Sequence, residues 1–176
     1  MATSTPAPDD GTPPSPPAPR HEILESAAGR IEAIETLIGL ARHSIRVFDV
    51  DLSESGWNSA ARAAAITAFL RADSTATLDI VVHDTGWIER SCPRLTGLLK
   101  YYGHAITIRR TGDDAKHVMD PLVLADDLHY LHHLHATQPR AVLGISEPDG
   151  VSPLVARFAE IWASAEPGIS ASVLGL

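Results

Sequence analysis

The sequence predicts an α/β fold: a mixed, mostly parallel sheet with helices on both faces and a β-hairpin in the C-terminal half. Helix-like and strand-like apolar patterns alternate between residues 28 and 110. Two short apolar runs, 120–125 and 128–133, flank the pair Asp126 and Asp127, which is typical of a tight hairpin turn. A chain of 176 residues with 44% hydrophobic residues fits one globular domain with a sizeable core.

The N-terminal segment differs in composition from the rest of the chain. Residues 1–20 contain seven prolines and no large aliphatic residue after Met1. Such a segment has nothing to bury and cannot offset the entropy lost on ordering, so we expect a disordered, polyproline-like tail. The folded domain is expected at 21–176.

In the first half of the domain, five apolar residues at helical spacing between Ile31 and Ala41 predict a helix at 28–43. Pro93 suits the first turn of a helix, and Gly103 suits its end. The expected order is an edge strand at 22–25, a helix at 28–43, a strand at 44–50, a helix from Asn58 to Arg71, a strand at 77–83, a helix at 92–102 and a strand at 105–110. The second helix is expected to bury an alanine-rich face formed by Ala61, Ala65, Ala68 and Phe69.

The second half is richer in strands. After the hairpin, the apolar run at 140–146 predicts another strand, and residues 152–165 predict a helix. That helix has a long apolar stripe made of Leu154, Val155, Phe158, Ile161 and Trp162. Residues 169–173 are expected to form a closing strand.

Three segments carry a family resemblance. They are LARHSIRVFDVDL (Leu40–Leu52), DPLVLADDLHYL (Asp120–Leu131) and VARFAEIWASA (Val155–Ala165). In this order and spacing they resemble one half of a phospholipase D superfamily fold, and they span nearly all of residues 21–176. The resemblance implies a bacterial domain family of unknown function related to that superfamily. Since the superfamily places two such halves face to face, it also implies a homodimer.

The superfamily's phosphodiester chemistry needs the motif H-x-K-x-x-x-x-D, in which the histidine attacks phosphorus and the lysine neutralises the phosphoryl oxygens. If His117 is the histidine, Met119 takes the lysine position and Leu124 the acid position. If Asp126 is the acid, Met119 takes the histidine position and Pro121 the lysine position. Either register fails at two of three positions, so His117 and Asp126 are weak catalytic candidates and we predict a degenerate, non-catalytic domain.

Four histidines fall within seven residues: His129, His132, His133 and His135. On an extended strand His129, His133 and His135 share one face, and the hairpin can bring Asp120 or His117 near them. Neutral imidazoles bind zinc, copper, nickel and iron. The spacing matches no closed zinc motif, so His129, His133, His135 and Asp120 are weak metal candidates, and the simpler interpretation is the polar face of an edge strand.

Acidic residues follow two strands that we expect to be neighbours. Asp49 and Asp51 lie at the end of one strand and Asp84 follows the other. Ligands bind at this end of open α/β sheets, where an acidic cluster can hold Mg²⁺ or a cationic ligand. Helix capping and loop solvation are the alternative explanation.

Charge and cysteine content argue against several kinds of partner and site. A net charge of −8 argues against binding to nucleic acids or anionic membranes, and the basic group of Arg109, Arg110 and Lys116 is the exception. The single cysteine, Cys92, cannot form an intramolecular disulfide or a cysteine-based zinc site. We see no secretory signal and no apolar run long enough to span a membrane, so we expect a cytoplasmic protein.

The sequence therefore predicts a non-catalytic, phospholipase D-like binding or assembly module with no cofactor. Its expected partner is a second copy of itself or a neighbouring or fused enzyme, and neither a nucleic acid nor a membrane. The alternative is a divergent phosphodiesterase or a metal-dependent hydrolase that uses His117 and the histidines from His129 to His135.

Overall fold

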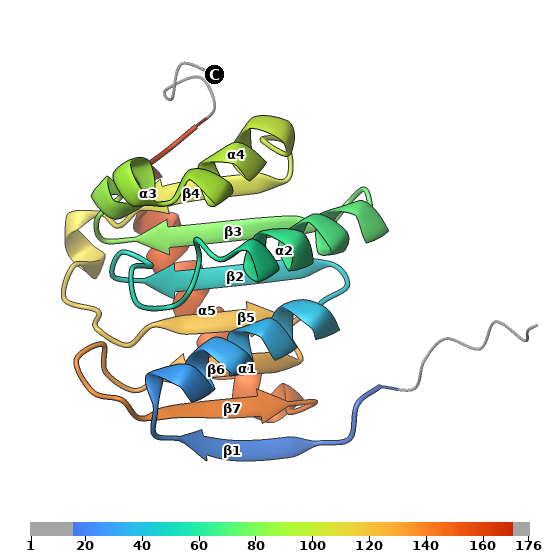
Figure 1. The fold of residues 1–176 in the computed structure, drawn as a ribbon. Helices are drawn as coiled ribbons and strands as arrows, with labels where there is room; N and C mark the ends of the chain where they lie inside the picture. The colour runs from blue at the N-terminus through green and yellow to red at the C-terminus, as the bar shows by residue number, and fades with distance from the viewer. Residues whose placement is uncertain (1–15, 171–176) are drawn as a thin grey trace, which may run out of the picture.

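The computed structural model describes residues 16–170. Its elements follow in the order β1 (Arg20–Leu24), α1 (Ala27–Leu40), β2 (Ser44–Asp49), α2 (Ala60–Ala72), β3 (Thr77–Val82), α3 (Gly86–Ser91), α4 (Pro93–Tyr101), β4 (Ile106–Arg110), the 3₁₀ turn η1 (Asp113–Ala115), β5 (Leu122–Ala125), β6 (His129–His133), β7 (Ala141–Ile145), α5 (Pro148–Ser164) and β8 (Glu166–Pro167). The strands of this range form one sheet in the order β1-β7-β6-β5-β2-β3-β4-β8 (Figure 1).

The sheet is mixed, but it is not mostly parallel as the sequence predicted. Only β2 with β3 and β3 with β4 pair in parallel in the described chain. The neighbours from β1 to β2 and the pair of β4 and β8 are antiparallel. Parallel pairing needs a long crossover, and among neighbouring strands only β2–β3 and β3–β4 are joined by one, through α2 and through α3 and α4. Short loops join β5, β6 and β7 into an antiparallel meander.

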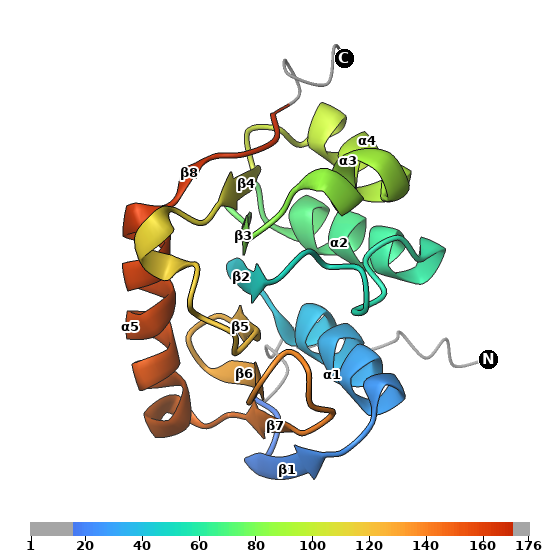
Figure 2. The same ribbon diagram turned by 90° about the vertical axis from the view of Figure 1, so that its left-hand side faces the viewer.

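Helices cover both faces of the sheet, as predicted. Figure 2 shows α1, α2, α3 and α4 on one face and α5 on the other. Side chains of β2 alternate between the two sides: Ile45 and Val47 are buried against the four-helix face, and Phe48 is buried against the α5 face with Phe158 and Ile161. The central strands are therefore apolar on both sides.

The predicted hairpin turn between β5 and β6 is confirmed. Asp126 and Asp127 have φ values of 53° and 51°, so both lie in the left-handed region that a type I′ turn requires. Aspartate tolerates this conformation better than most residues.

Several predicted boundaries differ from the structure. Helix α2 is capped by Ser59, whose side chain accepts from the Arg62 amide, while Asn58 accepts from the Arg94 amide at the start of α4. The buried face of α2 consists of Arg62, Ile66, Phe69 and Leu70, with Ala61 and Ala68 exposed. Burying the larger side chains removes more apolar surface from water, which decides the rotation of the helix.

The ends of the domain also differ from the prediction. Helix α5 begins at Pro148, and Pro153, a residue typical of a first turn, lies inside it. Helix α3 was not predicted. The closing strand is the short β8, while 169–170 are not in a strand and 171–173 lie outside the described residues. Strand β1 begins at Arg20, one residue before the expected boundary, and most of the predicted tail, 1–15, is likewise outside the described range.

Candidate functional site

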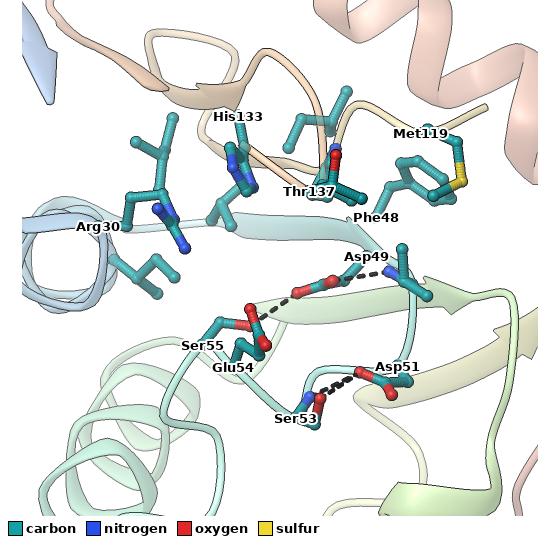
Figure 3. A pocket seen from close by; sticks show the side chains of 17 residues that line it. Arg30, Phe48, Asp49, Asp51, Ser53, Glu54, Ser55, Met119, His133 and Thr137 are labelled. Carbon is teal, nitrogen blue, oxygen red and sulfur yellow. Dashed lines mark hydrogen bonds between the residues drawn. The ribbon is translucent and has the colours of Figure 1, made fainter. Parts of the chain in front are cut away.

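A cavity of about 390 Å³ lies at the edge of the sheet where β2 and β6 end and β5 begins. These ends meet because β5 is antiparallel to both of its neighbours. The loop after β2, the segment leading into β5, the end of β6 and the first turns of α1 together form its walls (Figure 3). We refer to this cavity as the β2–β6 pocket.

The β2–β6 pocket has both apolar and polar lining residues. The apolar lining comes from Ile34, Phe48, Leu122, Val123 and Leu131, and Met119 and Pro121 extend it. Three carboxylates, one guanidinium, one imidazole and several hydroxyls line the rest. Such a lining suits a small molecule with both an apolar and a polar part.

Asp49 accepts hydrogen bonds through both of its carboxylate oxygens. Its Oδ1 accepts a hydrogen bond of 2.6 Å from the Val50 amide, and its Oδ2 accepts one of 2.7 Å from Ser55 Oγ. Burial raises the pKa of Asp49 and outweighs these two hydrogen bonds, which favour the ionised form. A positive charge placed beside Asp49 would therefore be favourable.

His133 faces Asp49 from the end of β6. Its side chain is only 8% exposed, and Figure 3 shows the ring pointing into the pocket. The ring nitrogen Nε2 is hydrogen-bonded to the Gln138 carbonyl, which only accepts, so Nε2 carries the proton. Burial lowers the pKa of His133, which favours the neutral ring, and Nδ1 then has a free lone pair that bonds to no group in residues 16–170.

The remaining charged groups make the pocket acidic. Asp51 accepts hydrogen bonds from the amide and hydroxyl of Ser53, at 2.9 and 2.7 Å. Glu54 forms no hydrogen bond with the described part of the chain and is exposed. Arg30 is the cation among the lining residues, and its Nη1 donates to the Pro139 carbonyl at 2.8 Å. The lining of the pocket thus carries three carboxylates and one guanidinium.

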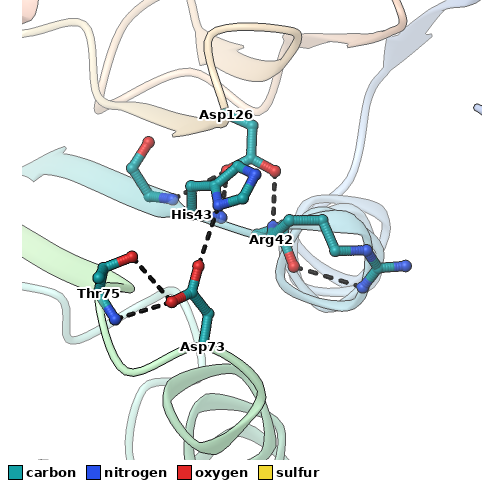
Figure 4. Close-up of polar contacts among 7 residues, drawn as sticks. Arg42, His43, Asp73, Thr75 and Asp126 are labelled. Carbon is teal, nitrogen blue, oxygen red and sulfur yellow. Dashed lines mark hydrogen bonds and ion pairs between the residues drawn. The ribbon is translucent and has the colours of Figure 1, made fainter.

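Asp126, a catalytic candidate, has a structural role in the folded domain. Its carboxylate accepts hydrogen bonds from three successive backbone amides at the start of β2: Arg42 at 2.6 Å, and His43 and Ser44 at 2.8 Å each (Figure 4). These contacts lie at the opposite end of β5 from the β2–β6 pocket. The structure therefore separates Asp126 from the pocket.

His117, the other catalytic candidate, also lies outside the β2–β6 pocket. It is exposed in the loop after η1 and lines a separate hollow of about 300 Å³ beside Asp114, Arg157 and Glu160. Two other residues from the tested motif registers, Met119 and Pro121, do line the β2–β6 pocket. In the register anchored on Asp126, these are the histidine and lysine positions.

The metal candidates are distributed over different places. His129 and His133 share the four-helix face of the sheet, as predicted, but His129 is buried and its Nδ1 accepts from the Ser146 amide at 2.8 Å. Burial lowers the pKa of His129. His135 lies in the loop after β6 with its Nδ1 2.9 Å from Thr137 Oγ1.

Asp120, the fourth metal candidate, lies on the α5 side of the sheet. It pairs with His132, the histidine predicted to point away from the others, at 3.0 Å, and with Arg157 of α5. Burial alone would raise the pKa of Asp120, but the hydrogen bonds from Arg157 and His132 outweigh burial and lower it. Across residues 16–170, no group of three or more His, Cys, Asp or Glu residues is arranged to hold a metal ion.

Two of the three acidic residues expected at the strand ends line the pocket. Asp84 instead accepts from the Gly86 amide at 2.9 Å, a local turn contact one residue before Thr85, the N-cap of α3. Sequence reasoning missed Arg30 and Glu54. A signal for Arg30 was present, because it lies four residues before Ile34 and so on the buried face of the predicted helix.

The basic group is occupied by contacts within the domain. Arg109 stacks over the Trp162 ring at 4.4 Å, Arg110 pairs with Glu166 at 2.9 Å, and Lys116 pairs with Asp113 at 2.7 Å. These pairs reduce the local positive field available to a phosphate. None of the helices between residues 16 and 170 has the length and apolar character needed to cross a membrane.

A family model described as a domain of unknown function, DUF7931, matches residues 26–171. The chain belongs to the DUF7931 family. No curated protein matches the sequence.

The DUF7931 domain is similar in structure to several solved proteins. TrmBL2, an archaeal chromatin protein with a novel mode of DNA binding, has a TM-score of 0.65 and 13% identity over 85% of this chain and 54% of its own. Nuc from Salmonella typhimurium, a phospholipase D family member, has a TM-score of 0.61 and 16% identity over 86% of this chain and 99% of its own. NucT from Helicobacter pylori has a TM-score of 0.58 and 13% identity over 85% and 99%.

These likenesses show that the DUF7931 domain has a phospholipase D-like fold, as the sequence resemblance implied. The domain covers nearly all of Nuc and NucT but about half of TrmBL2.

Proposed function

We propose that the DUF7931 domain is a non-catalytic phospholipase D-like domain that binds a small ligand in the β2–β6 pocket. The observation that carries the proposal is the presence of Met119 and Pro121 on the pocket wall, at the positions where the Asp126 register would place the motif histidine and lysine. In that register, neither side chain on the pocket wall is one that the superfamily reaction uses to attack phosphorus or to neutralise it.

Met119 and Pro121 cannot perform the roles of the motif histidine and lysine. A thioether does not serve as the nucleophile that this reaction needs, and the proline ring carries no charge to stabilise a phosphoryl oxygen. Asp126 is bound to three backbone amides at the other end of β5. The motif positions therefore supply neither a nucleophile nor a cation at the pocket.

His133 and Arg30 are the two pocket residues that an alternative phosphodiesterase would have to use. His133 has a free Nδ1 lone pair, and Arg30 carries a positive charge. Asp49, Asp51 and Glu54 surround the same space, and their negative charge repels a phosphate diester. This balance favours binding without turnover.

The test is release of nitrophenol from bis(4-nitrophenyl) phosphate, measured with the full chain and with H133A. We expect no release above the buffer rate from either protein, with and without added Zn²⁺ or Mn²⁺. Turnover by the wild type that H133A abolishes would refute the proposal.

We further propose that the domain assembles with a second copy of itself or with a neighbouring or fused enzyme, in the cytoplasm. The face-to-face arrangement implied by the phospholipase D resemblance supports the homodimer, and a single, buried cysteine fits a reducing compartment. Light scattering after gel filtration measures the mass directly. A monomer across the micromolar range would leave only the heterologous partner.

The proposal does not include a nucleic acid as ligand. TrmBL2 is described as a DNA-binding chromatin protein, but this chain carries a net charge of −8, and the acidic lining of its pocket would repel a phosphate backbone.

A further inference from the structure

We propose that the β2–β6 pocket takes an organic cation, a small ligand with a primary ammonium group on an apolar body. This inference rests on the proposed function, because it names the ligand class of the same pocket. Three features of the pocket support it: the negative charge of its lining, its free hydrogen-bond acceptors and its apolar lining residues.

The lining of the β2–β6 pocket carries a net negative charge. Asp49, Asp51 and Glu54 face the cavity, and Arg30 is the single cation of its lining. Their combined field attracts a positive ligand and repels an anion, most strongly in the part of the cavity least open to water. A phospholipase D-like pocket with this lining has the opposite preference from one built for phosphate.

Two residues of the pocket, His133 and Asp49, have hydrogen-bond acceptors to spare. His133 is more than nine-tenths buried, and with its Nε2 proton donated to Gln138, its Nδ1 presents a lone pair that no residue between 16 and 170 uses. The carboxylate oxygens of Asp49 retain lone pairs beyond the two hydrogen bonds that they accept.

Such groups require a donor. An ammonium group carries three N–H donors and no acceptor, whereas a phosphate would bring oxygen lone pairs against His133 Nδ1 and Asp49. A metal ion is less suited, because the described residues offer no set of three ligands.

The pocket also offers an apolar surface to the ligand. Ile34, Val123 and Leu131 line the pocket with apolar side chains that belong to the four-helix side of the sheet. Phe48, Leu122 and Met119 add apolar lining at the strand ends. A ligand body that covers this surface is stabilised by burial. The volume, about 390 Å³, lies near the lower end of the roughly 300–1,000 Å³ typical of small-molecule sites, which fits one ring or a short chain.

Asp49 connects ligand binding to pH. Burial raises its pKa, and Asp51 of the loop after β2 and His133 of β6 interact with its charge. Glu54 of the same loop and Arg30 of α1 are the other charged groups that line the pocket. A bound ammonium favours the ionised carboxylate, so binding shifts the Asp49 pKa downward and releases protons at pH values where the empty site is partly protonated. Affinity should rise with pH through the titration of Asp49.

The experiment is calorimetric titration of the full chain with four probes: phenethylamine, its neutral counterpart 2-phenylethanol, the anion phenyl phosphate, and MgCl₂. We expect saturable binding of phenethylamine and at least about tenfold weaker binding of the other three. D49N and E54Q should each weaken phenethylamine binding, with about a tenfold loss for D49N. E32Q changes the same charge on the exposed side of α1 and should bind as the wild type does.

The variants remain interpretable if folding is checked by thermal unfolding. Asparagine at position 49 keeps an oxygen that accepts from the Val50 amide, its NH₂ group can donate to the Ser55 hydroxyl oxygen, and a buried charge is removed, so D49N should unfold at the wild-type temperature or above it. Glu54 is exposed and unbonded in the described chain, so E54Q leaves the fold unchanged.

Each other outcome overturns a defined part of the argument. Binding of phenyl phosphate without turnover, binding of Mg²⁺ alone, equal binding of amine and alcohol, or no binding at all overturns the organic-cation inference. Turnover of bis(4-nitrophenyl) phosphate that is lost in H133A instead overturns the proposed non-catalytic function. The two failures are therefore distinguishable.

Discussion

The carboxylate of Asp126 holds the β5–β6 turn against the start of β2 through three backbone amides. Removing it leaves three N–H groups without their acceptor, and a hydrogen bond to a charged group contributes about 1.5–3 kcal/mol. We expect D126A to lower the free energy of unfolding by about 2–4 kcal/mol, as measured by urea denaturation.

D127A is the matched control for this substitution. Asp127 has nearly the same positive φ, so alanine has the same backbone cost there, but its carboxylate contacts only the Arg46 side chain at 2.6 Å and is 53% exposed. Such a surface pair contributes at most about 1 kcal/mol. Equal losses in the two variants would show that the turn conformation, and not the amide contacts, is responsible.

His129 predicts an acid sensitivity at the residue scale. Burial lowers its pKa in the folded protein, while an unfolded histidine titrates near its ordinary value of about 6.5. The unfolded chain therefore binds more protons as the pH falls, so the stabilisation is present above pH 6.5 and is lost progressively below it.

We expect H129Q to reduce this loss. Urea denaturation at pH 7.5 and 5.5 should show a smaller decrease in unfolding free energy for H129Q than for the wild type. Equal decreases would mean that the protonated ring is accommodated in the fold.

Among the elements, α1 and α2 are joined by a partly buried ion pair. The Arg62 side chain is fully buried, pairs with Glu35 through a 2.7 Å contact and lies 5.0 Å from the centre of the Trp57 ring. Burial lowers the pKa of Arg62 and outweighs the opposite effect of Glu35, so the guanidinium depends on this partner. The buried face of α2 therefore includes a charge that an apolar pattern does not reveal.

Removing Glu35 should destabilise the domain by about 2 kcal/mol, because it leaves Arg62 buried without a counter-charge. This is less than the 3–5 kcal/mol of a fully buried pair, since the Glu35 side chain is 33% exposed. The comparison is chemical denaturation of E35A and of E32A, an exposed control on the same helix that should change stability by less than about 0.5 kcal/mol. Similar values for the two variants would contradict the role of Glu35.

Elements whose apolar pattern is local were well predicted, and those set by distant contacts were not. The stripe from Ile31 to Ala41 and the Asp126–Asp127 turn contain their own signals, and α1 and the hairpin agree with them. The antiparallel pairing of β5 with β2 joins segments about 75 residues apart, and no short-range pattern encodes such pairing. This pairing, together with the antiparallel pairs of β1 with β7 and of β4 with β8, is why the expected parallel majority was wrong.

At the scale of the whole molecule, some residues of the pocket could be predicted from local sequence and others could not. Asp49 and Asp51 were found from the sequence because they follow a strand directly. Arg30 and His133 come from α1 and β6, and only the assembled sheet brings them to the same cavity. The metal candidates are separated in the same way: His129 and His133 lie at opposite ends of β6, and Asp120 lies on the other side of the sheet.

The net charge leads to a prediction for the intact protein. With −8 overall and the basic group paired internally, we expect no saturable binding to a fluorescently labelled 20-base-pair DNA duplex at micromolar protein and about 50 mM salt. Fluorescence anisotropy measures this directly. Binding that weakens steeply with added salt would show that a positive surface is available after all.

Strand β2 is hydrogen-bonded on both of its sides, to β3 and to β5, and Ile45, Val47 and Phe48 on it are almost inaccessible to water. Its amide protons should therefore be among the slowest to exchange with deuterium, since they are released only when most of the sheet opens. Asp49 is the last residue of this strand. Because Asp49 is anchored at the end of this strand, a ligand that binds it should lose little affinity in ordering that residue.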